Sequence, residues 1–478
     1  MFWNFENIKP DSIALIDDEL NEFYSYTDLN NEIDQIVSKL KFDSKKLIFS
    51  FCDNSSKSII FYLSALRSEN AIFLANSKMD SELKKRLISI YKPEIIFSID
   101  EINFELSSYK KFSLNDKYSF FQSENLDNNS LHKDLAVLLS TSGTTGSPKL
   151  VKLSYKNIQS NAVSISKYLN ITENEKPITS LPMNYSFGLS VINSHLLKGA
   201  TILCSNKSMV MREFWNTFNL QKCTSFSGVP YNYQMLQRLK FDKMNLPTLK
   251  NMTQAGGRLS EEYIKYFYDV SLNKNINFYV MYGQTEATAR ISYVPYENLG
   301  NKIGSIGIPI PGGKIKIISD KQEVNMPNEQ GELVYFGDNV MLGYAESRED
   351  LSQGDALKGE LHTGDLAFKD ADGFFYITGR LKRFIKLFGL RVNLDEVEKM
   401  LENNFTCAAA CYGNDDALKV LLQKHSDHIA ETARKKIIDI YKIHHSVIDV
   451  HCVDTIPVTS SGKKDYNLMK EMQFNECH

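Results

Sequence analysis

The sequence predicts an α/β fold in which doubly wound sheets of parallel strands carry helices on both faces. Short apolar runs of strand type, such as Leu47–Phe51 and Leu135–Leu139, recur along the N-terminal part of the chain. Segments with apolar residues at helical spacing separate these runs, and strands joined through helices pair in parallel. With 478 residues the chain is also too long for one compact core. Ligands of such a fold bind at the carboxyl ends of the strands.

The expected elements alternate along the chain. Helices are predicted over residues 29–40, 58–66, 81–91, 158–169 and 191–197. Strands are predicted over residues 47–51, 71–75, 94–99, 135–139, 178–181, 200–204, 224–230, 251–255 and 277–281. The segment 107–129 is rich in Ser, Asn, Lys and Asp, so we expect a linker or a loose surface excursion there.

The sequence pattern changes at Gly304, and from there to Arg380 glycine and proline residues separate short segments of strand type. This pattern predicts a small antiparallel β unit. Beyond it, helices are expected over residues 395–402 and 430–441, and strands over 408–412 and 418–423.

Composition and charge narrow the class of protein. The chain is 42% apolar and 24% charged, which is ordinary for a globular protein, and its net charge of −3 gives no sign of a basic surface for nucleic acid. Its seven cysteines include no Cys-x-x-Cys pair, which favours reduced thiols in the cytoplasm. We find neither an apolar run long enough for an integral membrane segment nor a signal peptide.

A candidate phosphate loop follows the predicted strand at 135–139. Its small hydroxyl residues and glycines can present N–H and O–H groups to a phosphate chain. The spacing differs from a Walker P-loop, which separates its two glycines by four residues and ends in Lys-Ser or Lys-Thr. By composition alone a surface turn is the commoner outcome, so the assignment depends on motifs further along the chain. The loop residues are Thr141, Ser142, Gly143, Thr144, Thr145, Gly146 and Lys149.

The string Tyr-Gly-Gln-Thr-Glu at residues 282–286 ends the predicted strand at 277–281. The ring of Tyr282 can stack on adenine, and Gly283 permits a sharp turn before Gln284. The hydroxyl of Thr285 can face an α-phosphate. Glu286 offers a hard oxygen ligand to Mg²⁺, which commonly takes a single protein carboxylate and fills its shell with phosphate and water.

The loop at 141–149 and the string at 282–286, in this order, resemble the AMP-forming, carboxylate-activating superfamily. Acyl-CoA synthetases, adenylation domains of peptide synthetases and luciferases belong to it, and the pattern here is most like the acyl-CoA synthetases. The resemblance extends from Leu135 to Lys463. It implies ATP and Mg²⁺ as cofactors, formation of an acyl-AMP with release of pyrophosphate, and transfer of the acyl group to a pantetheine thiol of CoA or of an acyl carrier protein.

The same resemblance assigns further residues to the nucleotide site. It implies that Lys463, Thr144 and Glu286 are catalytic, with Glu286 as the metal ligand. It further implies that the following residues contact the nucleotide: Gly256, Gly257, Arg258, Tyr282, Gly283, Gln284, Thr285, Asp365, Ile377, Arg380 and Arg391. Asp365 and Arg380 would bind the ribose hydroxyls, and Ile377 would pack on the adenine.

Domain boundaries are likewise implied by the resemblance. We expect an ATP- and acyl-binding domain of residues 1–380, a hinge at 381–382 centred on Lys382, and a small mobile α+β domain of residues 383–478. Gly389 would line the pantetheine tunnel, and Lys463 would enter the site from the small domain.

The acyl pocket is expected around Tyr185, Phe187, Gly188 and Val229. Amino-acid-activating relatives place an Asp near this helix start to pair with the substrate ammonium, and no Asp occurs between Glu175 and Glu213. An unpaired buried ammonium is costly, so a non-amino carboxylic acid is the favoured small-molecule substrate. Three alternatives stay open: an amino-acid-adenylating enzyme that loads a carrier protein, a luciferase-like oxidase, and a nucleotide-binding regulator without catalysis.

Overall fold

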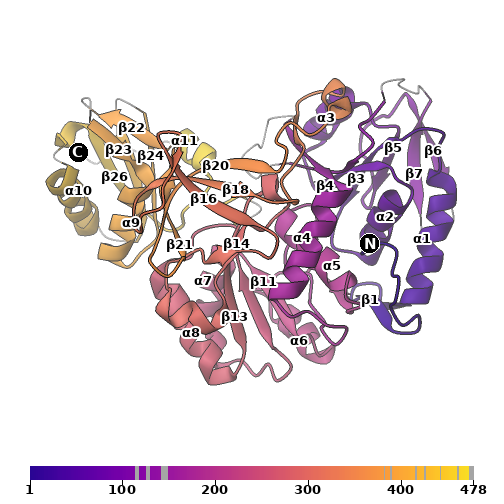
Figure 1. The fold of residues 1–478 in the computed structure, drawn as a ribbon, viewed down its shortest axis with the longest axis horizontal. Coiled ribbons are helices and arrows are strands. Elements are labelled where there is room, and N and C mark those ends of the chain that lie inside the picture. Colours follow the sequence, from indigo (N-terminus) through magenta and orange to yellow (C-terminus); the bar gives the residue numbers. More distant parts are fainter. Residues whose placement is uncertain are drawn as a thin grey trace.

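The computed structural model describes residues 1–113, 118–124, 130–140, 149–381, 383–387, 390–414, 417–424, 427–441, 443–459 and 462–472. An eight-stranded sheet forms the N-terminal end of the molecule (Figure 1). Its four central strands are parallel, as predicted, and antiparallel strands flank them on both sides. In order across the sheet the strands are β19 (Gly343–Ala345), β9 (Leu150–Ser154), β8 (Leu135–Ser140), β4 (Ala71–Asn76), β3 (Leu47–Cys52), β5 (Ile95–Ser98), β7 (Ser119–Ser123) and β6 (Tyr109–Ser113).

Helices cover both faces of this sheet, which explains why its strands read as continuous apolar runs. Along β3, Leu47, Phe49 and Phe51 pack on one side with Leu87 and Tyr91 of α3 (Ser81–Tyr91). The alternate residues of β3 pack on the other side in a core with α1 and α2. A strand buried on both faces needs apolar residues at every position. The helices of that second side are α1 (Tyr26–Leu40), α2 (Ser56–Arg67), α4 (Tyr155–Tyr168) and α5 (Ser186–Leu196).

The prediction of a linker over 107–129 is wrong for the part that the structure describes. β6 and β7 form an antiparallel hairpin there and extend the sheet beyond β5. Phe112 stacks near Phe120 with 5.2 Å between ring centroids, and Phe121 joins the core under the sheet. The lysines of β6 are exposed, which is a common protection for an edge strand, and they gave the segment its polar appearance.

A second sheet of five strands lies between the N-terminal sheet and the β unit. Its first three strands are parallel and carry α6 (Arg212–Leu220), α7 (Pro230–Arg238) and α8 (Glu261–Lys274). The strands in order are β11 (Ser225–Gly228), β12 (Asn251–Gln254), β13 (Asn277–Tyr282), β14 (Ser292–Tyr293) and β15 (Ile308–Pro309).

The strand predicted over 178–181 is wrong, because that segment makes only single bridges to β10 and β11. The segment runs between β10 and β11, which belong to two different sheets and pair with other strands there. β10 (Ile202–Cys204) instead belongs to a three-stranded sheet with β1 (Ile13–Asp17) and β2 (Glu22–Ser25).

The small β unit predicted from the glycine and proline pattern is present as an antiparallel sheet. Its strands in order are β17 (Gln322–Glu323), β16 (Lys314–Ser319), β18 (Gly331–Phe336), β20 (Glu360–Lys369) and β21 (Phe375–Arg380). Short 3₁₀ helices lie at η1 (Phe241–Lys243), η2 (Thr285–Ala287), η3 (Tyr296–Asn301), η4 (Glu349–Ser352) and η5 (His445–Val447).

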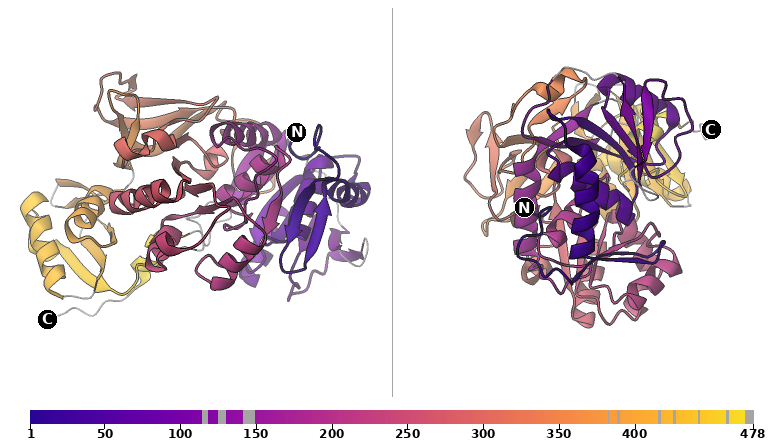
Figure 2. Two further views of the ribbon diagram at one scale, coloured as in Figure 1. Left: turned by 90° about the horizontal axis from the view of Figure 1, so that it is seen from below. Right: turned by 90° about the vertical axis from the view of Figure 1, so that its right-hand side faces the viewer.

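The C-terminal part has a hydrophobic cluster of its own, drawn from residues 385–448. It lies at the opposite end of the molecule from the N-terminal sheet (Figure 2). A hairpin precedes a three-stranded sheet and its helices: β22 (Phe384–Leu387), β23 (Leu390–Asn393), α9 (Leu394–Phe405), β24 (Ala409–Gly413), β25 (Leu418–Gln423), α10 (Asp427–Tyr441), β26 (Ile448–Val453) and α11 (Tyr466–Glu471). Among the residues that the structure describes, none of the helices has the length and apolar character needed to span a membrane.

Candidate active site

The predicted phosphate loop lies in the sequence between two neighbouring antiparallel strands of the N-terminal sheet, β8 and β9. Ser140 ends β8 and pairs with Leu150 of β9. The predicted loop residues Thr141, Ser142, Gly143, Thr144, Thr145 and Gly146 lie outside the described part of the chain. Lys149 is described, and its Nζ lies 3.7 Å from the centroid of the Tyr344 ring. A lysine so close to an aromatic face is held partly by a cation–π contact.

Tyr344 also connects the loop to the predicted metal ligand. Its hydroxyl donates a hydrogen bond of 2.9 Å to Oε1 of Glu286, and the strand that carries it pairs with β9. Thr285, beside Glu286, has its hydroxyl 3.2 Å from that of Ser186. The described residues contain no group of three or more His, Cys, Asp and Glu side chains that could hold a metal ion. One half-buried carboxylate next to a phosphate loop still suits Mg²⁺, which keeps water and phosphate oxygens as its other ligands.

The predicted ribose site centres on Asp365, whose side chain is buried. Asp365 lies opposite Arg380 in the pairing of β20 with β21, and Arg380 Nε donates to Asp365 Oδ1 over 3.0 Å. Gln284 Nε2 and the Tyr282 hydroxyl both donate to Oδ2 of the same carboxylate. Burial and the charge of Asp365 raise the pKa of Tyr282, so its hydroxyl stays protonated and continues to donate.

Ile377 lies on β21 next to this cluster, in the same hydrophobic group as Tyr282. The hydroxyl of Tyr282 is held by Asp365. The stacking of its ring on adenine stays a prediction. Gly283, between Tyr282 and Gln284, lies under the backbone of Ala289, where a Cβ atom would meet the carbonyl oxygen at 1.8 Å.

The residues predicted to line the acyl pocket come together where α5 meets the turn after β12. Tyr185 precedes the first residue of α5, and Phe187 and Gly188 lie in its first turn. Gly256 has a left-handed backbone with φ of +85°, and a Cβ atom there would lie 2.4 Å from the Tyr185 hydroxyl oxygen and 3.1 Å from Val229 Cγ1. Only glycine allows this approach, so Tyr185 and Val229 both pack against the turn at 256.

The turn at 256–258 is fixed by a buried amide, and it also reaches the C-terminal part. Gln254 Nε2 donates to the carbonyl of Gly257 over 3.0 Å. Arg258 was predicted to line the adenine site, but its guanidinium contacts Glu402 of α9, with 3.4 Å between Nη1 and Oε2. This ion pair links the turn at 256–258 to the C-terminal part of the chain.

Lys463 reaches the same space from the C-terminal part. Its Nζ lies 5.9 Å from the centroid of the Tyr185 ring. Burial lowers the pKa of Lys463, Arg380 lowers it further, and the carboxylates of Glu286 and Asp365 act in the opposite direction. These four groups therefore lie within electrostatic reach of one another, although they come from distant positions in the sequence.

The loop that carries Lys463 is closely fitted to the acyl pocket. Gly462 has φ of +75°, and a Cβ atom there would lie 2.3 Å from Val229 Cγ2. Thr459 closes the turn, since its N–H donates to the Lys463 carbonyl over 2.7 Å and its carbonyl accepts from Gly462. Residue 462 must therefore be glycine for both its conformation and its contact.

Three predicted residues of the hinge region carry no side-chain geometry. Lys382 and Gly389 lie outside the described residues, and for Arg391 only the backbone is described, paired with Lys386 in the hairpin of β22 and β23. The hinge, tunnel and conformational roles assigned to them stay predictions.

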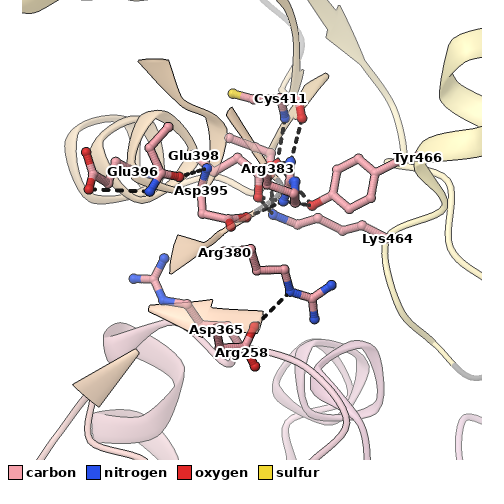
Figure 3. Close-up of polar contacts among 12 residues, drawn as sticks. Arg258, Asp365, Arg380, Arg383, Asp395, Glu396, Glu398, Cys411, Lys464 and Tyr466 are labelled. Atoms are coloured by element: carbon pink, nitrogen blue, oxygen red, sulfur yellow. Dashed lines mark hydrogen bonds and ion pairs between the residues drawn. The ribbon is translucent and has the colours of Figure 1, made fainter. Parts of the chain in front are cut away.

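A buried charge network beside the hinge was missed in the sequence (Figure 3). Arg383 contacts Asp395 and Glu398 of α9 and donates to the hydroxyl of Tyr466 over 2.9 Å. Lys464 Nζ lies 2.8 Å from Glu398 Oε2. The network thus ties the residue after the hinge to the residue after Lys463. The sequence shows only that Arg383 and Lys464 stand next to predicted site residues. A charged residue in such a place is ordinarily taken to be exposed, so the sequence did not indicate the network.

Comparison with known proteins agrees with this geometry. The model of the AMP-binding enzyme family matches residues 2–345. A 4-hydroxybutyrate–CoA ligase of Metallosphaera sedula is 28% identical over 350 residues, which are 69% of this chain and 61% of the relative. An oxalate–CoA ligase of Arabidopsis thaliana is 28% identical over 346 residues, 69% of this chain and 66% of the relative. The match thus spans less than two thirds of the length of either relative.

Among solved structures, an o-succinylbenzoate CoA synthetase of Bacillus subtilis in complex with its acyl-adenylate intermediate superimposes with a TM-score of 0.80. The alignment covers 99% of this chain and 98% of that one at 23% sequence identity, a level at which it supports the fold. Since the family match covers well over half of the 478 residues, the chain belongs to the family of AMP-binding enzymes.

Proposed function

We propose that the protein is an ATP-dependent ligase that activates a carboxylic acid as its acyl-AMP, with release of pyrophosphate, and then transfers the acyl group to a pantetheine thiol. The observation that carries this proposal is the position of Lys463. A lysine supplied by the C-terminal part lies within electrostatic reach of Glu286, Asp365 and Arg380 and beside Tyr185. A cation at this point can stabilise the negative charge that develops on the α-phosphate during adenylation.

Adenylation by these residues is positional and electrostatic. The substrate carboxylate attacks the α-phosphorus of ATP, and the bond to pyrophosphate breaks. Lys463 stabilises the negative charge that develops on the α-phosphate, while the predicted phosphate loop and Lys149 hold the leaving group. Mg²⁺ bound at Glu286 would neutralise charge on the phosphates. Asp365 would bind the ribose hydroxyls as an acceptor, with Arg380 holding its orientation.

We propose that residues 1–380 and 383–478 act as two domains joined at 381–382. The separate hydrophobic cluster of residues 385–448 supports this division. Rotation of the small domain would withdraw Lys463 and open a path for the thiol, which then attacks the acyl carbon and releases AMP. The two curated relatives named above are CoA ligases, which favours CoA over a carrier protein as the acceptor. Seven cysteines without a Cys-x-x-Cys pair suit an enzyme of the cytoplasm.

The charges around Tyr185 argue for a substrate without an amino group. The ionised side chains that act on this tyrosine or contact its ring are the cations Lys463 and Arg290. A substrate ammonium would meet two like charges in a partly buried space, and its binding would be weakened by about several kcal/mol. This disfavours the amino-acid-activating alternative.

The test is an ATP–pyrophosphate exchange assay over a panel of fatty, aryl, hydroxy, dicarboxylic and amino acids. We expect exchange above the acid-free background with at least one non-amino acid, followed by thioester formation when CoA is added. Exchange with amino acids alone would support the alternative enzyme. Absence of exchange with every acid, under conditions where ATP binding is measured, would refute the ligase proposal.

A further inference from the structure

Arg290 is a buried cation in the wall of the predicted acyl pocket. It follows the string at 282–286 by a few residues, its exposed fraction is 2%, and it is the largest fully buried side chain among the described residues. Its guanidinium lies 3.9 Å from the centroid of the Phe187 ring, and the hydroxyls of Tyr168 and Tyr185 are its polar neighbours. None of the sequence motifs includes it.

The positive charge of Arg290 has no partner of opposite charge among the described residues. No Asp or Glu of that part of the chain forms an ion pair with it, and its Nε atom has no hydrogen-bond acceptor there. Burial raises the pKa of Tyr168 and of Tyr185 to about 12, so both hydroxyls are neutral at physiological pH and cannot balance the charge. Buried charges in proteins are ordinarily paired, because an unpaired one costs several kcal/mol.

A small cavity of about 20 Å³ lies against Arg290, between α5 and the strands β11 and β12. Its polar lining includes Ser190, Ser227 and Thr253. The hydroxyls of Ser227 and Thr253 are 2.8 Å apart, so one of them donates to the other and the second hydrogen is available to another acceptor. The guanidinium and the hydroxyl donor border a space of about the size of one water molecule, which has room for a single carboxylate oxygen.

Among the residues that the structure describes, Glu175 supplies the one carboxylate that lines this cavity, and this carboxylate has other partners. Its Oε2 accepts from Thr224 over 2.6 Å, and its Oε1 is paired with Lys250 at 3.0 Å. Glu175 therefore does not neutralise Arg290.

Tyr185 connects this cation to the reacting centre. Its ring is beside Lys463, where the carboxylate to be activated would lie, and its hydroxyl is among the groups that Arg290 acts on. An acid that presents one carboxylate to the α-phosphate beside Lys463 could thus extend past a single tyrosine side chain to reach Arg290.

We propose that the substrate is a short dicarboxylic acid, whose reactive carboxylate lies beside Lys463 and whose second carboxylate is bound by Arg290. This inference rests on the proposed function and narrows it to one class of acid. Arg290 acts here as a specificity-determining residue that contacts the substrate and takes no part in bond making.

The test compares dicarboxylic acids of three to six carbons with their monomethyl esters and with monocarboxylic acids of equal length. Pyrophosphate exchange and calorimetric binding are measured for the wild type, Arg290→Met and Arg290→Lys. We expect the wild type to prefer one short diacid over its monoester by about 100-fold or more in kcat/KM, as for the loss of one partner from a buried charge pair. Arg290→Met should lose that preference, mainly through KM, and Arg290→Lys should recover part of it.

The outcomes separate the two levels of the proposal. Calorimetric binding of a diacid that Arg290→Met abolishes supports the second-carboxylate site even if no exchange occurs, and then only the ligase proposal fails. A wild type that prefers monocarboxylic acids, or that binds no diacid, overturns the site while leaving the ligase proposal intact. If Arg290→Met does not fold, as judged by its thermal transition, the wild-type preference and Arg290→Lys decide the question.

Discussion

Replacement of Lys464 by methionine removes a cation that the buried Glu398 and the half-buried Glu402 share, and its cost can be estimated from the network in Figure 3. Lys464 Nζ lies 2.8 Å from Glu398 Oε2 and 3.0 Å from Glu402 Oε1. Removing one partner of a buried ion pair costs about 3–5 kcal/mol. Arg383 still contacts Glu398 at 2.9 Å in the variant, so we expect the lower end of that range, about 3 kcal/mol.

Native-state hydrogen exchange measures this cost locally in the full chain. In the regime where exchange reports the opening equilibrium, about 3 kcal/mol corresponds to exchange about 10²-fold faster. We expect that acceleration for the amides of α9 and β24, with α4 unchanged. Lys419→Met is the matched control, because Lys419 is exposed on β25 of the same part of the chain. Its effect should stay within about 0.5 kcal/mol.

Lys464→Met should also affect catalysis, since Lys464 directly follows Lys463 in the chain. Loosening its anchor should lower pyrophosphate exchange more than conversion of supplied acyl-AMP to thioester. Amide protection in α9 that is equal in Lys464→Met and Lys419→Met would refute the assignment of this network as a structural anchor.

Four further predictions concern the site itself. Lys463→Ala should lower pyrophosphate exchange roughly 10²–10³-fold but leave thioester formation from supplied acyl-AMP unchanged, and equal loss of both would contradict its role. Burial lowers the pKa of Lys463 from the ordinary lysine value of 10.5, and the protonated amine is the active form. The kcat/KM for adenylation should therefore decline with rising pH before pH 10.5 is reached, and Lys463→Arg should remove this alkaline decline. Gly462→Ala should reduce pyrophosphate exchange, because the new methyl group clashes with Val229 and the backbone gains about 1–3 kcal/mol of strain. Adding Val229→Ala should relieve the clash but leave the strain, so activity should return only in part. Full activity of Gly462→Ala would argue against the close fit. Tyr344→Phe removes the hydrogen bond to Glu286, so the KM for magnesium-ATP should rise about tenfold in a steady-state titration, whereas an unchanged KM would separate this tyrosine from the metal site.

Motifs at strand ends could be read from the sequence because their residues are contiguous. Glu286 lies four residues after the end of β13. The helix α3 begins and ends at the predicted residues 81 and 91, since local periodicity and a capping Asp80 specify it. Similarly, β25 covers the predicted residues 418–423. In each case neighbouring residues carry the whole signal.

Burial and long-range pairing could not be read in this way. Arg290 lies between an alanine and an isoleucine, where a charge ordinarily indicates an exposed position, and only the fold shows that it is buried. The Tyr282 hydroxyl meets a carboxylate 83 positions away, and Arg258 meets Glu402 144 positions away. The strands at 109–123 are polar by composition, and their stability comes from the sheet that they extend.

The pairing of β19 with β9 makes the relative position of Lys149 and Glu286 insensitive to length changes elsewhere. Tyr344 lies opposite Val151, so backbone hydrogen bonds fix the tyrosine relative to the loop that ends at Lys149. Several strands of the β unit precede Tyr344 in the chain, and their exposed turn at Asp320 and Lys321 lies outside this pairing. Insertions at that turn should therefore be tolerated without moving Lys149 relative to Glu286. The position is thus a natural attachment point for a fused domain or a reporter on an active enzyme.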